Sequence, residues 1–293
     1  MATITRADLP ALGSSSSSSS FITDVKHLSS YNWIDAAEPT IAVPGCPPSW
    51  TPPKIPPQLS LDAGKVYIDQ NAARHPDSPL EPLFRSLFHT NPTFDISSVD
   101  VVTDRNNIRK LLDFVNPNLD TYDLNQFRGF GNNFEKAYTS SEIAKSTGHH
   151  RIISYSFGGL KFIVRHETDG YVKTLSSPDD HPRQTQDETS LDNSPVSSAD
   201  AAYAISGSKL HIRHVGKEVP VESTLKIKTR GVKSRLEISE VVPQLWLSQT
   251  PKLVRAYHNK GKFQKPQVED VTIEIQRWQF GHEEDLRRLN GLI

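Results

Sequence analysis

Two short carboxylate patterns are the strongest candidates for chemistry in this chain. Glu167 and Asp169 flank one threonine at the end of an expected strand, and Glu135 opens an expected helix. Side chains at positions i and i+2 of a strand share one face, so Glu167 and Asp169 can point at one cation. A hard divalent ion such as Mg²⁺ prefers carboxylate oxygens. These residue types suit a metal-dependent hydrolase of phosphodiester or pyrophosphate bonds, which also needs a cationic side chain for the phosphate.

Each pattern also has a simpler structural interpretation. A Glu-x-Asp pair at a strand end is often only solvated, and a glutamate at the start of a helix is favoured by the helix dipole. Lys226 and Lys228 share a face of another expected strand, where lysines commonly prevent an exposed edge from pairing. Taken one at a time, these patterns leave both interpretations open.

Alternating strand and helix patterns surround these residues and must position them. A helix is expected over 79–89, where leucine and phenylalanine recur at helical spacing after an early proline. A strand over 98–103 leads into a helix that Asp104 can cap, and two β-rich runs joined by a Gly-Gly turn predict a hairpin over 151–169. Strands are also expected at 208–213, 223–229 and 252–257, and helices at 236–248 and 270–292. This alternation predicts an α/β or α+β fold.

The beginning of the chain differs in composition from the rest. It holds an unbroken serine run at 14–20, and residues 1–60 contain nine of the 21 prolines, which lack a backbone donor. We therefore expect 1–60 to form a largely extended Ser/Pro-rich arm, pinned to the core by apolar anchors such as Tyr31. Residues 61–293 are expected to form a single domain, with a flexible insertion at about 174–205.

Composition and charge exclude several classes of protein. Lys and Arg number 33 against 34 Asp and Glu, so the net charge of −1 argues against a broad basic surface for nucleic acid, although a local groove remains compatible. The single cysteine, Cys46, cannot form an internal disulfide or a zinc site, which is typical of an intracellular protein. We expect no membrane span and no secretion signal, because long apolar runs are absent from the sequence.

Five short motifs occur in the same order as in a known family. They are Val-Val-Thr-Asp-Arg at 101–105, Gly-Asn-Asn-Phe-Glu at 131–135, Glu-Thr-Asp at 167–169, Leu-Lys-Ile-Lys-Thr at 225–229, and a helix-then-strand pattern from Pro243 to Tyr257. Over roughly residues 95–265 they resemble the decapping-exonuclease (Rai/DXO) family, with its Gly-Tyr-x-Phe-Glu, Glu-h-Asp and Glu-h-Lys motifs, where h is apolar. The chain resembles a divergent, fungal-type member.

The resemblance implies a mixed α/β fold, with a two-sheet core related to PD-(D/E)XK nucleases and flanking helices. It implies hydrolysis at RNA 5′ ends (decapping, pyrophosphohydrolysis or removal of NAD) with Mg²⁺ or Mn²⁺ as cofactor. The implied partners are RNA 5′ ends and a 5′→3′ exonuclease, in the nucleus or cytoplasm. Carried over by motif, the site residues are Glu135, Glu167 and Asp169 for the metal, Arg105 for phosphate, Lys228 for charge at the scissile phosphate, and Gln244 for orienting phosphate or water.

Two departures from the family pattern predict altered chemistry. Lys226 stands where the family has the glutamate of its Glu-h-Lys motif, so a cation replaces a metal ligand. Two unit charges about 4 Å apart repel by about 4 kcal/mol at an intermediate dielectric, so we expect weakened metal binding, with the Lys226 ammonium paired to Glu167 and Asp169 instead. The interval of 30 residues between Arg105 and Glu135 is also short, which indicates lost strands or a flawed gene model.

These departures leave three hypotheses. The first is a metal-dependent RNA 5′-end hydrolase with impaired catalysis. The second is a non-catalytic RNA- or protein-binding pseudoenzyme of the same fold, and it is favoured if no carboxylate replaces the one lost at Lys226. The third is a structural scaffold without a phosphate site, in which Arg105 would not converge with the three carboxylates.

Overall fold

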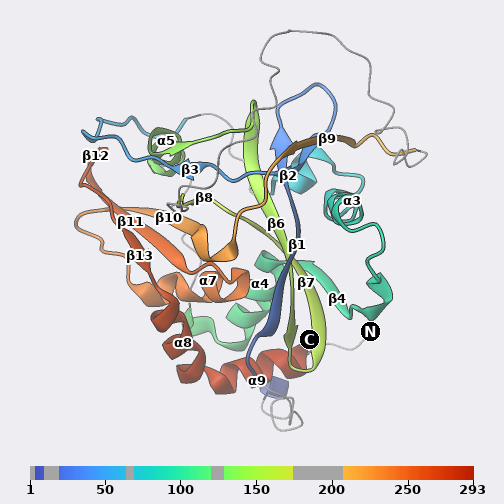
Figure 1. The fold of residues 1–293 in the computed structure, drawn as a ribbon. Helices are drawn as coiled ribbons and strands as arrows, with labels where there is room; N and C mark the ends of the chain where they lie inside the picture. Colours follow the sequence, from blue (N-terminus) through green and yellow to red (C-terminus); the bar gives the residue numbers. More distant parts are fainter. Residues whose placement is uncertain (1–3, 10–19, 64–68, 120–128, 174–206) are drawn as a thin grey trace, which may run out of the picture.

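Two β-sheets built from distant parts of the chain form the centre of the molecule (Figure 1). The computed structural model describes residues 4–9, 20–63, 69–119, 129–173 and 207–293. The six-stranded sheet has the order β4-β7-β6-β1-β2-β9. Its strands are β1 (Thr23–Ile34), β2 (Thr40–Gly45), β4 (Val101–Asp104), β6 (Ser146–Phe157), β7 (Leu160–Glu167) and β9 (His211–Gly216).

The second sheet is smaller in extent and consists mostly of short strands. Its path is β12-β11-β10-β8-β3-β5, with β13 paired to β11. The longest members, β10 and β11, run parallel. The strands are β3 (Ser49–Trp50), β5 (Thr139–Ser140), β8 (Gly170–Tyr171), β10 (Thr224–Gly231), β11 (Lys252–Asn259), β12 (Lys262–Phe263) and β13 (Val268–Asp270).

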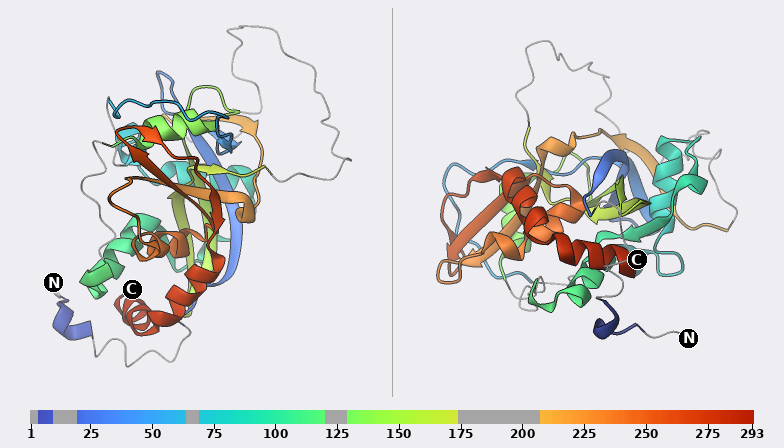
Figure 2. Two further views of the ribbon diagram at one scale, coloured as in Figure 1. Left: turned by 90° about the vertical axis from the view of Figure 1, so that its left-hand side faces the viewer. Right: turned by 90° about the horizontal axis from the view of Figure 1, so that it is seen from below.

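Helices cover the sheets from outside, and Figure 2 shows their arrangement from two further directions. The α-helices are α2 (Gln70–Arg74), α3 (Glu81–Thr90), α4 (Arg105–Val115), α5 (Gly131–Tyr138), α7 (Val242–Ser248), α8 (Thr272–Gly281) and α9 (Glu283–Leu292). Short 3-10 turns are η1 (Arg6–Asp8), η2 (Ile96–Ser98), η3 (Pro117–Leu119), η5 (Val221–Ser223) and η6 (Ile238–Glu240). Among the described helices, none has the length and apolar character needed to cross a membrane. This two-sheet arrangement with flanking helices confirms the expected mixed α/β class.

The β6–β7 hairpin forms where the sequence predicts it. Gly158 and Gly159 connect the strands with φ values of 61° and 84°, a left-handed conformation that glycine adopts without steric cost. A side chain at Gly158 would also collide with Asn290 of α9, since a Cβ there would lie 1.8 Å from its Oδ1. The turn therefore requires glycine for backbone conformation and for its close contact with the last helix.

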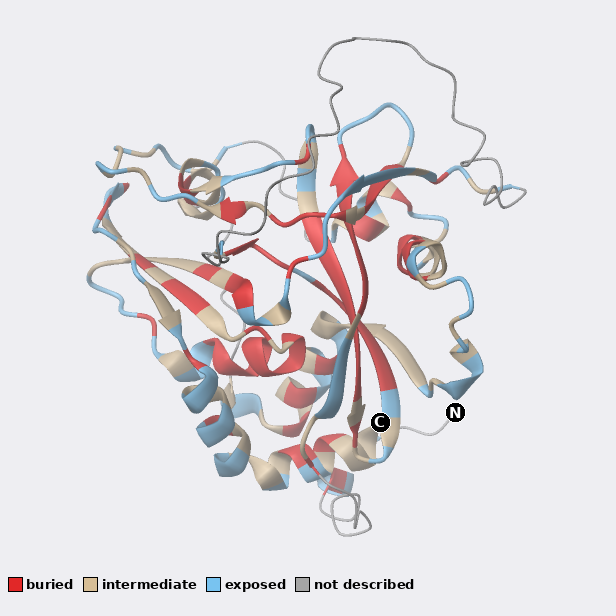
Figure 3. Ribbon diagram, in the orientation of Figure 1, coloured by how far each residue is buried: buried red, intermediate tan, exposed pale blue. Residues whose placement is uncertain are grey.

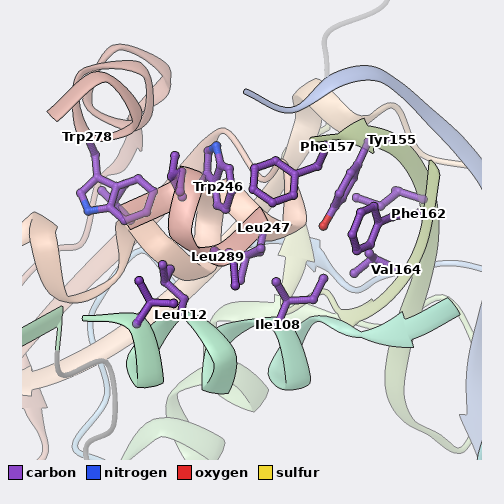
Figure 4. Packing of buried hydrophobic residues seen from close by; sticks show 14 of the residues in the cluster. Ile108, Leu112, Tyr155, Phe157, Phe162, Val164, Trp246, Leu247, Trp278 and Leu289 are labelled. Carbon is purple, nitrogen blue, oxygen red and sulfur yellow. The ribbon is translucent and has the colours of Figure 1, made fainter. Parts of the chain in front are cut away.

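The hairpin strands β6 and β7 carry buried apolar side chains on both faces of the six-stranded sheet. On one face, Tyr155, Phe162 and Val164 pack against α4, α7 and α9, as the close view in Figure 4 shows. On the opposite face, Ile152 and Ile163 join β1 and β2 side chains and the buried leucines of α3. Figure 3 shows the consequence: the long central strands and α7 are buried, while much of α8 is exposed.

The N-terminal region is placed differently from the expected arm. β1 lies inside the six-stranded sheet, hydrogen-bonded to β6 on one side and β2 on the other. Tyr31 and Trp33 are completely buried there. The sequence conceals this strand because several of its buried residues are polar. Their hydrogen bonds reach distant partners: Ser29 Oγ donates to the Ser86 carbonyl at 2.9 Å, and Asn32 Nδ2 to the Cys46 carbonyl at 3.0 Å. Residues 20–50 therefore belong to the core.

Several boundaries also differ from expectation. Only 242–248 of the expected helix at 236–248 is α-helical, and this helix begins one residue before Pro243. Pro243 therefore lies in the first turn, where a backbone N–H has no partner within the helix and its absence costs nothing. The terminal helix is divided into α8 and α9 at His282. The expected insertion at 174–205 lies outside the described residues, as do the serine run at 14–19 and part of the short Arg105–Glu135 interval.

Candidate phosphate and metal site

The Glu-Thr-Asp motif lies where the chain passes from one sheet to the other. Glu167 is the last residue of β7 in the six-stranded sheet, and β8 of the second sheet begins at Gly170. β8 pairs with β10, where Gly170 lies opposite Leu225. This antiparallel register brings Asp169, one residue before Gly170, beside Lys226, one residue after Leu225.

Lys226 and Asp169 form a largely buried ion pair. The Lys226 Nζ donates to Asp169 Oδ1 at 2.6 Å, and the two side chains are 14% and 3% exposed. The second carboxylate oxygen, Oδ2, accepts the Ile227 backbone N–H at 2.8 Å. Both oxygens of Asp169 are thus engaged by β10, and the expected pairing of Lys226 is confirmed for Asp169.

Glu167 and Glu135 face the same cluster with weakened acidity. Loss of water around Glu135, followed by the nearby charge of Asp169, raises its pKa well above the usual range, although Lys226 opposes this shift. The surrounding protein likewise raises the pKa of Glu167, while Lys226 lowers it. Glu167 is exposed and Glu135 is half-buried, so both carboxyls remain within reach of solvent. Glu135 lies on α5, which packs against β10.

Arg105 and Lys228 bring positive charge to the same place. Arg105 is the first residue of α4, and its pKa falls to about 10 because water is excluded, while Asp169 opposes the fall. Lys228 shares the face of β10 with Lys226, and loss of water together with the Lys226 charge lowers its pKa to about 7. Electrostatic interactions therefore connect Arg105, Lys228 and the carboxyls, which is the convergence that a scaffold without a phosphate site would lack.

Arg165 supports this arrangement, although the sequence analysis did not single it out. Its guanidinium is fully buried and donates from Nε and Nη2 to the two carboxylate oxygens of Asp104 at 2.6 and 2.8 Å. Asp104 consequently makes no side-chain cap on α4, although it occupies the expected cap position. The pair instead joins β7 to the start of α4, where Arg105 follows. A charged residue inside the apolar run of β7 was the signal that could have identified it.

Replacing Asp104 with asparagine is expected to lower the free energy of unfolding by about 2 kcal/mol, because it leaves a buried guanidinium without its counter-charge. The loss should be smaller than for complete removal, since Arg165 Nη1 still donates to the Pro79 carbonyl at 2.7 Å. Urea denaturation measures the effect, with exposed Asp77→Asn as the matched control. Equal stability of the two variants would contradict this role of Asp104.

Gln244 lies apart from the hydrogen bonds of the cluster. It is buried on α7, which packs against α4. Within the part of the chain that the structure describes, no hydrogen bond joins its side chain to Arg105 or to the carboxyls. The structure thus brings together Arg105, Lys228 and the three predicted carboxyls, while a contact from Gln244 stays a prediction.

The carboxyls do not fit a divalent cation as they are arranged. Both oxygens of Asp169 already accept hydrogen bonds, one of them from an ammonium group. Among the described residues, no group of three or more His, Cys, Asp and Glu side chains has an arrangement that could hold a metal ion. A cation would have to displace Lys226 and overcome its charge to bind Asp169.

Solved structures with a similar fold include those of three fungal proteins. They are S. pombe Rai1 (TM-score 0.53, 12% identity, covering 98% of this chain and 87% of that one), Scheffersomyces stipitis Rai1 in complex with (3′-NADP)⁺ and calcium ion (0.55, 11%, 100% and 85%), and Candida albicans Rai1 in complex with pU5-Mn²⁺ (0.54, 11%, 92% and 81%). The expected resemblance to the Rai/DXO family is therefore confirmed as a shared fold.

One family model matches the sequence itself. No curated protein matches it. The model of a family described as "Domain of unknown function (DUF8563)" matches residues 3–126 and 124–293, which together span nearly the whole chain. The chain therefore belongs to the DUF8563 family and has the fold of the fungal Rai1 structures.

Proposed function

We propose that this protein recognises RNA 5′ ends through their phosphates, and that it descends from a metal-dependent 5′-end hydrolase whose catalysis is impaired here. The observation that carries the proposal is the Lys226–Asp169 ion pair, beside which Arg105 and Lys228 lie. Candidate roles for the residues follow from this arrangement. Arg105 and Lys228 would hold phosphate, and the carboxyls of Glu135 and Glu167 would accept a metal only if Lys226 withdrew.

The fold supports the substrate class, and the Lys226–Asp169 pair supports the loss of activity. Fungal Rai1 has been crystallised with manganese and a short 5′-phosphorylated oligonucleotide, and with calcium and a dinucleotide. In this chain the position beside Asp169 is taken by an ammonium group that cannot activate water. A non-catalytic RNA-binding pseudoenzyme is the second candidate, favoured by the same ion pair. A 5′→3′ exonuclease partner and a location in the nucleus or cytoplasm remain expectations.

Hydrolysis of 5′-triphosphate RNA with Mn²⁺ tests the catalytic part of the proposal. We expect the wild-type protein to be inert or slow, and Lys226→Glu to raise the rate at least about 10-fold, because removing the ammonium and adding a carboxylate restores a metal ligand. Lys226→Gln, which removes the charge without adding a ligand, is the matched control and should gain less.

The outcomes distinguish the two candidates. Activity in Lys226→Glu that disappears on adding Glu135→Ala would support a decayed hydrolase. Wild-type activity that Glu135→Ala abolishes would contradict impaired catalysis. Failure of every variant would leave only the binding role.

A further inference from the structure

Two histidines from distant parts of the chain meet at one edge of the six-stranded sheet. His89 lies in the last turn of α3, and His214 lies on the edge strand β9. Their ring nitrogens, Nε2 of His89 and Nδ1 of His214, are 3.2 Å apart and form a hydrogen bond. Neither residue belongs to the candidate phosphate and metal site, so the proposed function gives this pair no role.

We propose that His89 and His214 form a binding site for a divalent transition-metal ion such as Zn²⁺ or Cu²⁺, which joins α3 to β9. Imidazole nitrogen is a preferred ligand of both ions, whereas Mg²⁺ and Mn²⁺ prefer oxygen. This inference goes beyond the proposed function and does not depend on it.

The separation of the two ring nitrogens suits a shared ion. Zinc lies about 2.0–2.1 Å from each histidine nitrogen, which puts two such ligands about 3.3 Å apart in a tetrahedral arrangement. A square-planar Cu²⁺ site with similar bond lengths brings them to about 2.9 Å. The observed 3.2 Å lies between these values. The rings are thus already at the separation of two ligands of one ion, and rotation of the rings would direct both lone pairs at it.

Metal binding requires a change of tautomer and no change in the charge of the protein. When both rings are neutral, one of the two facing nitrogens carries the hydrogen that the other accepts. A metal ion needs a lone pair on both, so that hydrogen must move to the other nitrogen of the same ring. His214 is exposed, so water can exchange the proton. Water can also occupy the remaining coordination positions, as it does in open zinc sites.

The two elements hold the histidines in place. β9 pairs with β2 over its whole length, and His214 lies opposite the buried Val43. Ile212, two residues earlier on the same face of β9, packs against the core cluster to which α3 contributes Leu83 and Leu87. A preformed pair of ligands loses little conformational entropy when it binds an ion.

The local charges are compatible with a cation. The carbonyl end of a helix carries partial negative charge, and His89 lies in the last turn of α3. Arg85, one turn before His89, is paired with Glu81 at 3.3 Å, so its charge is offset. Arg213 precedes His214 on β9 and points to the opposite face of the strand. The pair therefore faces no uncompensated charge from either arginine.

Isothermal titration calorimetry of the full chain with ZnCl₂, in a buffer without chelators, tests this inference. We expect one Zn²⁺ per chain, and at least about 10-fold weaker binding in His214→Asn. Changing a group that only supports a metal ligand already costs about 10–100-fold in affinity, so removing the ligand itself should cost no less. Mn²⁺ should bind more weakly than Zn²⁺, in line with the usual order of divalent ions.

His211→Asn is the matched control, because His211 is exposed on β9 and points to the opposite face from His214. It should bind Zn²⁺ as tightly as the wild-type protein. His89→Asn tests the ligand on the helix, and it should weaken binding as His214→Asn does. Thermal denaturation without metal establishes that each variant is folded. With Zn²⁺ added, the midpoint should rise in the wild-type protein and in His211→Asn only.

Each result has a distinct meaning. Weaker Zn²⁺ binding in both His89→Asn and His214→Asn, with His211→Asn unchanged, supports the site. Weaker binding in only one of the two would contradict a shared ion, and an equal loss in His211→Asn would contradict the location. Equal binding by all four proteins, or no Zn²⁺ binding by the wild-type protein, would overturn the inference. None of these outcomes bears on the hydrolysis of RNA, so the proposed function is tested separately.

Discussion

Replacing Asp169 with alanine is expected to lower the free energy of unfolding by about 3 kcal/mol, one of the two largest effects for this chain. The change leaves the Lys226 ammonium largely buried without a counter-charge, and removing one partner of a buried ion pair commonly costs about 3–5 kcal/mol. It also leaves the Ile227 N–H without its acceptor. We choose the lower end of that range because Lys226 is 14% exposed and water can reach it.

A double variant distinguishes the effect of the unpaired charge from other effects of Asp169→Ala on stability. Asp169→Ala combined with Lys226→Met removes both charges, so we expect it to recover at least half of the lost stability in urea denaturation. Mn²⁺ should not stabilise the wild-type protein in the same measurement. A double variant as unstable as Asp169→Ala alone would show that the unpaired charge is not the cause.

Acidification from pH 7 to pH 5 is expected to destabilise the protein through its buried histidines, and two neighbours on β6 contribute roughly 4 kcal/mol of that loss. His149 and His150 are neighbours on β6, buried on opposite faces of the sheet. Burial, followed by the charge of Arg151, lowers the pKa of His149 well below its usual range. Burial, followed by Arg165, lowers the pKa of His150 to about 3. Both side chains therefore stay neutral in the folded protein under conditions that protonate them in the unfolded chain.

The direction of this pH dependence follows from which state, folded or unfolded, binds more protons. A histidine in the unfolded chain has a pKa of about 6.5, so below that pH it binds a proton that the same buried histidine does not bind in the folded chain. The free energy of unfolding therefore falls by about 2 kcal/mol for each histidine between pH 7 and pH 5. Glu135 and Glu167 oppose part of this loss, because their raised pKa values let the folded state bind protons as the pH falls. The difference between variants isolates the histidine contribution.

His149→Asn tests this prediction without removing the local hydrogen bond. The asparagine amide can replace His149 Nδ1, which lies 2.9 Å from Asn32 Oδ1. We expect urea denaturation at pH 7, 6 and 5 to show a pH-dependent loss smaller by about 2 kcal/mol than in the wild type. His211→Asn, at an exposed position of β9, should leave the loss unchanged. An unchanged loss in His149→Asn would contradict the assignment.

Local patterns determined the hairpin and much of the site. The Gly-Gly turn between two β-rich runs specifies the β6–β7 hairpin within one short segment. The two-residue period of a strand likewise puts Lys226 and Lys228 on one face of β10, whatever the rest of the fold does. The expectation that Lys226 would pair with a carboxyl came from the resemblance, which puts this lysine where the family has a metal-binding glutamate.

Tertiary structure decided the features that depend on distant partners. Asp104 directly precedes a helical pattern, as an N-cap residue does, yet its carboxylate pairs with Arg165, 61 residues away. β1 is hidden in the sequence because Ser29 and Asn32 find their hydrogen-bond partners only after the chain has folded.

The partner of Lys226 was likewise decided in part by the sequence and in part by the tertiary structure. The sequence by itself determined that a lysine stands among acidic motifs, and the expected pairing included both Glu167 and Asp169. The antiparallel register of β8 and β10 brought Asp169 beside Lys226, and the Ile227 N–H took the remaining oxygen. Residue types and spacing are local properties, whereas the pairing of strands far apart in the chain depends on the packing of the whole fold.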